Sequence, residues 1–340
     1  MAVRVAINGF GRIGRNILRA IVESGRTDME VVAVNDLGPV ETNAHLLRFD
    51  SVHGRFPQEV TVNGDTITTG GQSFKVTAVK NPAELPHRDM KVDLVMECTG
   101  IFTSVGKARA HIDAGARRVL VSAPITADET MKGEKTIVFG VNHDSLTADD
   151  VIVSNGSCTT NCLAPLAMIL NDLVGIDKGM MTTIHSYTGD QPTLDTMHKD
   201  LYRGRAAAMS QIPTSTGAAK AIGLVIPELK GRLDGISIRV PTPNVSLVDL
   251  KFIAKRDTTV QEINEAVIAA ADGKLKGIMG YTRFPNVSID FNHDSHSSTL
   301  AIDQTKVMDG TFVQVLSWYD NEWGFSNRMA DTAVVMAKTL

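Results

Sequence analysis

The residues most capable of chemistry lie near the middle of the chain, around a cysteine set among hydroxyl and amide side chains. They form the run Ser154-Asn155-Gly156-Ser157-Cys158-Thr159-Thr160-Asn161-Cys162, between an apolar stretch at 151–153 and a helical apolar pattern at 163–173. A strand that feeds a helix through such a turn places Cys158 at the helix N-terminus, where the dipole and unpaired N–H groups lower a thiol's pKa. We therefore predict a nucleophile at Cys158, over the alternative of an inert buried thiol, and a packed second thiol at Cys162.

A nucleophilic thiol needs a base or a cation beside it, and His185 is the strongest candidate. It ends a predicted strand, residues 180–187, among Ser186, Tyr187 and Thr188 rather than on an apolar face. A protonated imidazole at this position would stabilise the thiolate. The alternative, for any one of nine histidines, is a surface or core residue without a catalytic role.

A group of side chains downstream of His185 suits phosphate. Arginine and hydroxyl groups bind phosphate oxygens through short, charge-assisted hydrogen bonds. The candidates are Arg203, Arg205 and Arg239, with Thr188, Thr214, Ser215, Thr216 and Gly217. The alternative is an arginine stripe on a solvated surface. No metal site is predicted, because Cys158 and Cys162 lack a second pair of ligands at zinc spacing.

The N-terminus has the signature of a dinucleotide-binding turn. Residues 3–7 predict a strand, and Asn8-Gly9-Phe10-Gly11-Arg12-Ile13-Gly14 follows and opens a helix. In that context Gly9 makes the turn, Gly11 lets a pyrophosphate approach the backbone, and Gly14 lets helix and strand pack. A second strand, residues 31–34, leads to Asp36, at the distance expected for an acid that binds a ribose. Because Asp36 repels a 2′-phosphate, NAD is predicted over NADP; a purely structural loop is the alternative.

Length and composition limit the classes of protein that fit. A chain of 340 residues is too long for one ordinary core, so two domains are expected. A net charge of −4 provides no field for polyanions, which argues against nucleic acid as a partner. A membrane is not expected either, because no apolar run could span one and no charged-then-apolar leader precedes the first strand. Three cysteines suit reduced thiols in a cytoplasm.

The remaining patterns indicate how these residues are positioned. Residues 59–79 predict an antiparallel insertion, and strands at 92–97 and 118–123 with a helix at 107–114 resume a doubly wound α/β pattern. Thr99, Gly100 and Ser122 follow strand ends, where such a sheet binds its ligand, whereas Cys98 is expected in the core. Predicted strands at 180–187, 240–255, 288–292 and 312–318, with a helix at 260–271, indicate an α+β second domain with a mixed, largely antiparallel sheet. A long polar segment at 188–213 and a last helix at about 324–338 complete the chain.

Six stretches together resemble the phosphorylating glyceraldehyde-3-phosphate dehydrogenases, over nearly the whole chain. They are residues 8–15, Val34-Asn35-Asp36, the stretch from Ser157 to Cys162, residues 183–188, residues 239–244 and residues 318–324. The resemblance implies a Rossmann domain at 1–157, joined by the C-terminal helix at 321–340, and a catalytic domain at 158–320. It also implies a homotetramer in which the long loop after His185 lies near a neighbour's cofactor.

The resemblance further implies a reaction and the residues for it. The Cys158 thiolate attacks an aldehyde, His185 takes the hydroxyl proton of the hemithioacetal, hydride passes to NAD, and inorganic phosphate cleaves the thioester. Thr188 and Arg239 correspond to the substrate-phosphate site, with Asp190 and Arg203 beside them, and Ser157, Thr216 and Gly217 to the inorganic-phosphate site, with Thr159 next to the thiol. The implied cofactor contacts are Asn8, Gly9, Gly11, Arg12, Ile13, Gly14, Asp36, Lys80, Thr99, Gly100 and Ser122, with Asn321 for the nicotinamide carboxamide.

Some positions depart from the family's usual pattern and keep alternatives open. Gly156 stands where alanine is usual, and Thr196-Met197 replaces a Leu-Pro pair common in strictly NAD-dependent members, which leaves some NADP use open. Residues 282–294 resemble the sister erythrose-4-phosphate dehydrogenases, so the longer sugar phosphate is the alternative substrate. From other classes, a thiol hydrolase or acyltransferase and a dinucleotide-sensing binding protein also fit parts of the pattern.

Overall fold

The computed structural model describes residues 2–125 and 135–340, and the chain divides into two compact units. Unit 1 comprises Met1–Ile137, His143–Gly156 and Ser326–Leu340, and unit 2 comprises Val138–Asn142 and Ser157–Phe325. The boundary before the cysteine helix lies between Gly156 and Ser157, one residue from the expected position. The assignment of residues 138–142 to unit 2 had no signal in the sequence.

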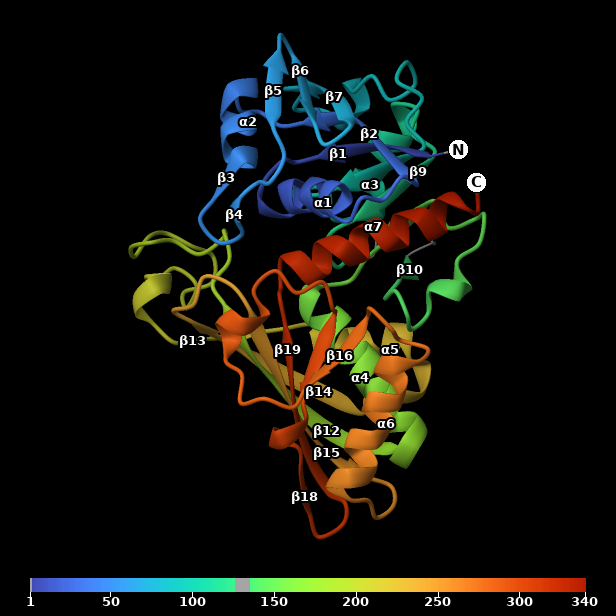
Figure 1. Ribbon diagram of the computed structural model, residues 1–340, viewed down its shortest axis with the longest axis vertical. Coiled ribbons are helices and arrows are strands. Elements are labelled where there is room, and N and C mark those ends of the chain that lie inside the picture. The colour runs from blue at the N-terminus through green and yellow to red at the C-terminus, as the bar shows by residue number, and fades with distance from the viewer. Residues whose placement is uncertain (1, 126–134) are drawn as a thin grey trace. The chain divides into compact units, whose positions relative to one another are not determined.

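Unit 1 is built on a nine-stranded sheet (Figure 1) in the order β10-β11-β9-β8-β1-β2-β7-β6-β5. The bounds are β1 Val3–Asn8, β2 Met29–Asn35, β5 Val60–Asn63, β6 Thr66–Thr69, β7 Gln72–Thr77, β8 Leu94–Glu97, β9 Arg118–Val121, β10 Lys135–Thr136 and β11 Ile152–Ser154. Neighbours from β10 to β7 pair in parallel, and β7, β6 and β5 pair antiparallel. The predicted doubly wound sheet with an antiparallel insertion is therefore confirmed.

The helices of unit 1 begin where local signals allow. α1 (Arg12–Glu23) starts directly after the glycine turn and buries Ile17, Leu18 and Ile21 completely. α3 (Val105–Asp113) starts after Ser104, whose Oγ accepts a hydrogen bond from Lys107 N at 3.3 Å. α2 (Val40–Arg48), which leads into the short hairpin β3 (Phe49–Asp50) and β4 (Gly54–Arg55), is short and polar and was not predicted. Among the described residues, no helix is both long and apolar enough to cross a membrane.

Unit 2 is built on an eight-stranded mixed sheet in the order β13-β14-β12-β15-β19-β17-β16, with β18 paired to β19. The bounds are β12 Ile176–Ser186, β13 Ile212–Ser215, β14 Leu233–Val240, β15 Ser246–Ala254, β16 Met279–Thr282, β17 Ser298–Ala301, β18 Lys306–Met308 and β19 Phe312–Tyr319. β12 pairs with β14 in parallel and with β15 antiparallel. The predicted mixed, largely antiparallel sheet is confirmed.

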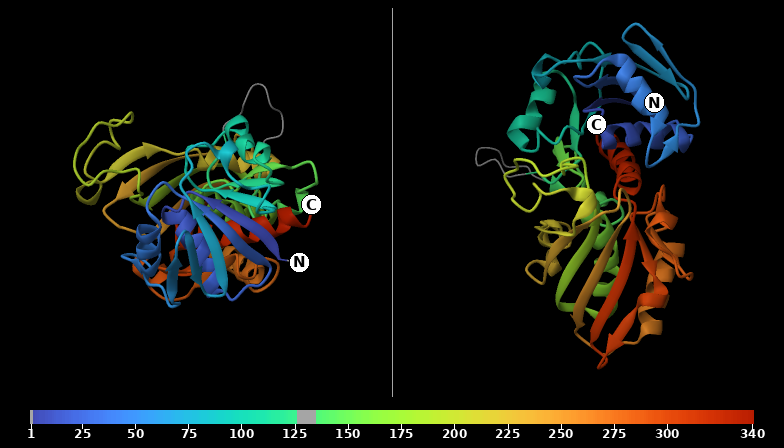
Figure 2. Two further views of the ribbon diagram at one scale, coloured as in Figure 1. Left: turned by 90° about the horizontal axis from the view of Figure 1, so that it is seen from above. Right: turned by 90° about the vertical axis from the view of Figure 1, so that its left-hand side faces the viewer.

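Three helices cover one face of this sheet: α4 (Cys158–Val174), α5 (Ala218–Val225) and α6 (Val260–Asp272), as Figure 2 shows. Leu166 and Leu170 of α4 are fully buried in one apolar cluster with Leu250 and Val315 of the strands. Burial alternates along β15 and β19, so every second side chain points into this core. The core thereby holds the first turn of α4 against the sheet.

The other face of the unit 2 sheet carries apolar side chains that remain partly or well exposed within the chain. We call this surface the open face and define it by Met180, Ile184, Ile236, Ile238, Leu247, Ile253, Phe312 and Leu316. The strand register places them on one side, since Ile184 pairs with Ile238 and Leu247, and Ile253 with Phe312. Met180 is 56% exposed and Ile236 47%, which is unusual for strand centres.

Some predicted elements differ in the structure. The expected strand at 288–292 is a 3₁₀ helix, Ser288–Phe291, because Asp290 accepts a hydrogen bond from Val287 N at 2.9 Å and closes a tight turn. The expected strand at 240–255 is β15 alone, and residues 241–245 form a turn between it and β14. The helix α5, the strands β13, β14, β16, β17 and β18, and the segment 138–142 were missed. The last helix, α7 (Trp323–Ala337), begins within a residue of its predicted start, and its Thr332 Oγ1 donates to Asn155 Oδ1 at 2.8 Å.

Candidate active site

The N-terminus of α4 and the end of β12 bring the predicted catalytic pair together. Ser157 caps α4, with its Oγ accepting from Thr160 N at 3.1 Å, and Cys158 is the first helical residue. His185 lies near the end of β12, beside Arg239 of β14 in the parallel register. The Cys158 Sγ lies 3.4 Å from His185 Nε2. Thiol and imidazole are therefore within reach of direct proton transfer.

The hydrogen bond on the far side of the imidazole fixes its tautomer. His185 Nδ1 lies 2.7 Å from the Ser186 carbonyl oxygen. Because a carbonyl can only accept, Nδ1 carries the hydrogen and Nε2 presents its lone pair to Cys158. Burial, followed by the positive charge of Arg239, lowers the pKa of His185 to about 3. The imidazole is therefore neutral, with the Nε2 lone pair that a base needs directed at Cys158.

The pKa of the Cys158 thiol is shifted in the direction opposite to the one expected from its place at a helix N-terminus. Burial raises the pKa of Cys158, although the nearby charge of Arg239 acts in the opposite direction. The lowered pKa of buried His185 argues against the predicted pairing of a thiolate with a protonated imidazole. The helix terminus and hydrogen bonds at Thr159 do not outweigh desolvation here. Among the charged groups, Arg239 gives the largest stabilisation of a thiolate.

An anion-binding cluster surrounds the end of β12. Arg239 Nη1 donates to the Ser186 carbonyl at 3.1 Å and to Thr188 Oγ1 at 2.9 Å. Arg203 pairs with Asp190 at 2.8 Å and its Nε donates to Thr214 Oγ1 at 3.1 Å. Thr188 Oγ1 in turn donates to Asp190. Two arginines and a hydroxyl thus converge beside the catalytic pair, whereas the remaining arginine of the predicted group, Arg205, pairs with exposed Asp195 instead.

The other predicted anion contacts lie at helix starts in unit 2. Gly217 precedes α5 and caps it without a side-chain hydrogen bond, and Thr216 Oγ1 accepts from Ala218 N at 3.2 Å. Ser157 occupies the corresponding position before α4. Thr159 differs, because its hydroxyl is buried and lies 2.9 Å from the hydroxyl of Tyr319. Its hydroxyl therefore contacts Tyr319, next to the thiol of Cys158.

Two features of unit 2 were not identified from the sequence. The Tyr319 hydroxyl lies between Thr159 Oγ1 and Thr183 Oγ1, the latter at 2.8 Å, and so joins α4 to β12 behind the thiol. The Asn321 Oδ1 accepts hydrogen bonds from Ser186 Oγ at 2.8 Å and Ser246 Oγ at 2.9 Å. With the oxygen engaged, the amide nitrogen of Asn321 is the group left to donate to a ligand. Neither arrangement has a local sequence signal, since each depends on which strands are neighbours.

Unit 1 contains a cavity of about 550 Å³ at the carboxyl ends of its parallel strands. It is lined by Asn8, Gly9, Gly11, Asn35, Asp36, Leu37, Val79, Lys80, Cys98, Thr99, Ile101 and Phe102. Six predicted cofactor residues thus meet there, while Arg12, Ile13, Gly14, Gly100 and Ser122 do not line it. Cys98 lines this cavity and is not in the core, which corrects its predicted placement; burial and then Glu97 raise the pKa of its thiol.

The glycines of the turn fit a dinucleotide for steric reasons. A Cβ on Gly9, whose φ is +90°, would lie 2.8 Å from Thr99 N, and a Cβ on Gly14 would lie 2.1 Å from Gly9 O. Gly11 has open space around it and no side chain caps α1, which leaves room for a pyrophosphate at the start of the helix. Asp36 is held by Phe10 N and Gly38 N, at 2.9 and 3.0 Å, at the cavity edge.

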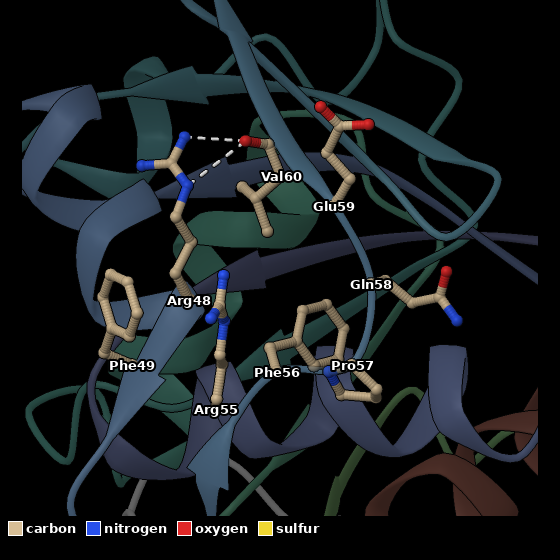
Figure 3. Close-up of a pocket in the computed structure, with 8 residues that line it drawn as sticks. All are labelled: Arg48, Phe49, Arg55, Phe56, Pro57, Gln58, Glu59 and Val60. Atoms are coloured by element: carbon tan, nitrogen blue, oxygen red, sulfur yellow. Dashed lines mark hydrogen bonds between the residues drawn. The ribbon is translucent and has the colours of Figure 1, made fainter.

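A second cavity in unit 1, of about 610 Å³, shows that size alone does not locate the site. It is formed by one segment, residues 48–60, with Arg48 held against the Val60 carbonyl at 2.7 Å (Figure 3). None of its eight lining residues carries a thiol, an imidazole or a hydroxyl group. It also contains no predicted site residue. The smaller cavity at the strand ends is therefore the candidate cofactor pocket.

Comparison with known proteins agrees with this geometry. Residues 3–105 match the family model "Glyceraldehyde 3-phosphate dehydrogenase, NAD binding domain", and residues 157–321 match the C-terminal domain of the same enzyme. The chain is 73% identical over 338 residues to glyceraldehyde-3-phosphate dehydrogenase of Xanthobacter flavus, covering 99% of both chains. It is 71% identical over 340 residues to that of Cereibacter sphaeroides and 58% identical over 341 residues to that of Zymomonas mobilis, covering each chain completely. The resemblance seen in the motifs is thus confirmed, and the chain belongs to the glyceraldehyde-3-phosphate dehydrogenase family.

Proposed function

We propose that this protein oxidises glyceraldehyde 3-phosphate with NAD and joins the product to inorganic phosphate, giving 1,3-bisphosphoglycerate. The observation that carries the proposal is the Cys158–His185 contact at 3.4 Å beside the cluster of Arg239, Arg203 and Thr188. A thiol hydrolase would use the same pair, but the chain's NAD-binding domain gives it a hydride acceptor. A sensor of dinucleotides would have no use for the pair. A cytoplasmic location is part of the proposal and rests on the three free thiols.

The protein's own groups move the protons of this reaction. Cys158 Sγ attacks the aldehyde carbon while its proton passes to His185 Nε2 and then to the aldehyde oxygen, which forms the hemithioacetal. His185 takes the same proton back from the hydroxyl as the carbon loses hydride, and a thioester remains on Cys158. NAD, when bound, supplies the hydride acceptor. An oxygen of hydrogen phosphate then attacks the thioester carbon and releases its proton to solvent, while Cys158 leaves as the thiolate and recovers its own proton from His185.

Two anion sites follow from the positions of the polar groups. Arg239 and Thr188 hold the substrate's phosphate, and Arg203 and Asp190 keep Thr188 and Arg239 in place. Ser157, Thr216 and Gly217 hold the attacking phosphate at the starts of α4 and α5. A thioester hydrolase has no need of a second anion site. The pair of sites therefore supports phosphorylating chemistry.

The cofactor residues are assigned on the fit of the unit 1 cavity. The turn Gly9–Gly14, with Arg12 and Ile13, receives the pyrophosphate, and Asp36 receives the adenosine ribose. Lys80, Thr99, Gly100 and Ser122 complete this part of the site, and the Asn321 amide nitrogen holds the carboxamide. Arg12 is itself held by Asp50 at 2.5 Å. Its guanidinium thus links the start of α1 to the short hairpin at Asp50.

The same proposal includes a homotetramer. Within the described part of the chain, no layer covers the apolar side chains of the open face, and the segment 188–211 carries a second set of exposed apolar residues. Leu194 is 72% exposed, Met197 97%, Leu201 86% and Tyr202 63%. Two separate apolar surfaces on one chain suit an assembly of two-fold pairs, as in a tetramer. A second copy of the chain is therefore the proposed cover for the open face.

The function is tested by following NADH formation with glyceraldehyde 3-phosphate and with erythrose 4-phosphate, each with and without inorganic phosphate. We expect a higher kcat/KM for the shorter sugar and turnover only with phosphate, although one extra carbon changes discrimination by only about 1–3 kcal/mol when packing alone decides. Cys158→Ser should abolish activity. Preference for erythrose 4-phosphate with water as acceptor would overturn the substrate assignment. Full activity in Cys158→Ser would overturn the mechanism.

The neutral state of His185 leads to a second prediction. His185→Asn should lower kcat by roughly two to four orders of magnitude through loss of the base, but leave the pH midpoint of Cys158 alkylation by iodoacetamide nearly unchanged. Arg239→Gln should move that midpoint upward, because it removes the largest charge effect that favours the thiolate. The opposite pattern, a shift with His185→Asn and none with Arg239→Gln, would show that a charged imidazole is paired with the thiolate.

Asp36 sets the third prediction, which concerns the choice of cofactor. Asp36→Gly should raise the ratio of kcat/KM for NADP to that for NAD about tenfold, because like-charge repulsion of the 2′-phosphate is lost. Asp36→Asn is the matched variant: it removes the charge and keeps an acceptor for Phe10 N or Gly38 N. Equal use of NAD and NADP by the unaltered enzyme would show that Asp36 does not discriminate.

The fourth prediction concerns assembly. Ile236→Lys, on the open face, should lower the mass measured by light scattering below four times 36.6 kDa, because a charge in an apolar interface is costly to desolvate. Leu224→Lys is the control, since Leu224 is 67% exposed on α5, away from the open face, and should leave the mass unchanged. An unchanged mass in Ile236→Lys would remove the open face from the assembly.

A further inference from the structure

Beneath the cofactor pocket lies a buried carboxylate that the reaction does not use. Glu97 is the last residue of β8 and is 1% exposed. Its Oε1 accepts hydrogen bonds from Thr99 N at 2.7 Å and from Thr99 Oγ1. Its Oε2 accepts from Asn8 Nδ2 at 2.6 Å and lies 2.9 Å from His111 Nε2. Both oxygens are therefore fully engaged by groups from β1, α3 and the loop after β8.

The partners of Glu97 define its chemical state. Backbone N–H, hydroxyl and amide groups donate to it, and His111 Nε2 must also donate, because a carboxylate only accepts. His111 is completely buried and its Nδ1 lies 3.1 Å from His87 Nε2. The two oxygens of a carboxyl group satisfy all of these partners, whereas a carboxamide would set one hydrogen against another. The site is thus built for the two oxygens of a carboxyl group.

The network continues from Glu97 to other walls of the pocket. Asn8 Oδ1 accepts from Asn35 Nδ2 at 2.7 Å, and Asn35 Oδ1 accepts from Val79 N at 2.9 Å and from Thr77 Oγ1 at 2.8 Å. Asn8, Asn35, Val79 and Thr99 all line the cavity. Both the nitrogen and the oxygen of the Asn8 side-chain amide therefore form hydrogen bonds with other side chains of the protein. Four strand ends, those of β1, β2, β7 and β8, are tied together through side chains in addition to the sheet hydrogen bonds.

We propose that Glu97 is a positioning residue for NAD: its carboxylate holds Asn8 and Thr99, and through Asn35 the edge at Val79 and Lys80, in the arrangement that binds the dinucleotide. The inference rests on the assignment of this pocket to NAD in the proposed function. Glu97 touches no reacting atom, so it sets affinity for the cofactor and not the rate of the chemical step. A merely structural role would instead stabilise unit 1 with no particular effect on NAD.

The test begins with Glu97→Gln, which keeps the size of the side chain and turns one acceptor into a donor facing Asn8 and His111. We expect the Kd for NAD, measured by calorimetry, and the KM for NAD to rise about five- to tenfold, since an unsatisfied buried donor disturbs the wall of the pocket. The kcat at saturating NAD should stay within about twofold and the KM for the aldehyde should not change. NAD affinity equal to that of the unaltered enzyme would overturn the proposal.

Val119→Ala controls for loss of stability, because Val119 is fully buried in the same sheet and lines no part of the pocket. At a matched fall in Tm it should leave the Kd for NAD unchanged; an equal rise would reduce Glu97 to a structural role and overturn the proposal. Asp36→Asn distinguishes failure of the Glu97 proposal from failure of the assignment of NAD to this pocket. Unchanged NAD and NADP binding in both Asp36→Asn and Glu97→Gln would mean that NAD does not use this pocket.

A second pair of variants serves if Glu97→Gln does not fold. His111→Leu removes one donor from Glu97 and should raise the Kd for NAD, whereas His111→Gln restores an N–H group at that position and should return the Kd toward that of the unaltered enzyme. Equal affinity in the two variants would show that the hydrogen bond to Glu97 has no influence on the cofactor, and would overturn the proposal.

Discussion

The Ser186 carbonyl oxygen accepts hydrogen bonds from His185 Nδ1 at 2.7 Å and from Arg239 Nη1 at 3.1 Å. This one carbonyl oxygen therefore sets the tautomer of His185 and the position of Arg239, the charged group that most favours a Cys158 thiolate. The Ser186 hydroxyl also donates to Asn321 Oδ1. Because burial keeps His185 neutral and Cys158 protonated, the resting site stores little charge separation. In the proposed reaction, charge develops only when the substrate brings its phosphate to Arg239 and its carbonyl to the thiol and the neutral imidazole.

Features decided by neighbouring residues in the sequence were accessible without a structure. The glycine turn, the acid at the end of the second strand and the start of α4 at Cys158 all depend on local backbone geometry and on Ser157, whose side chain caps the helix. Apolar runs identified most strands of unit 1 for the same reason, whereas β13, β14, β16, β17 and β18 of unit 2 were not predicted. Family resemblance then supplied the order of the two domains and the reaction. These elements carry most of the fold and the catalytic pair.

Features that depend on which distant segments of the chain come together in the fold could not be predicted from the sequence. Nothing in the sequence around Glu97 indicates that His111 and Asn8 close over it, and nothing around Tyr319 indicates that it joins Thr159 to β12. The direction of the Cys158 pKa shift was missed because a helix terminus lowers the pKa while desolvation raises it. The extent of desolvation depends on tertiary packing, which the sequence does not show. The strand expected at 288–292 failed because a single Asp290 hydrogen bond favours a tight turn.

The open face also has a thermal consequence. Its defining side chains are aliphatic and aromatic, and the polar residues interspersed among them are already engaged in part, since Asp249 pairs with Lys251 and accepts from Gln314. Attraction between such surfaces is largely entropic near room temperature and weakens on cooling. An assembly held through this face therefore loosens in the cold while each chain's own hydrogen-bonded sheet persists, so storage near freezing favours dissociated chains that keep their fold but expose an apolar sheet to one another.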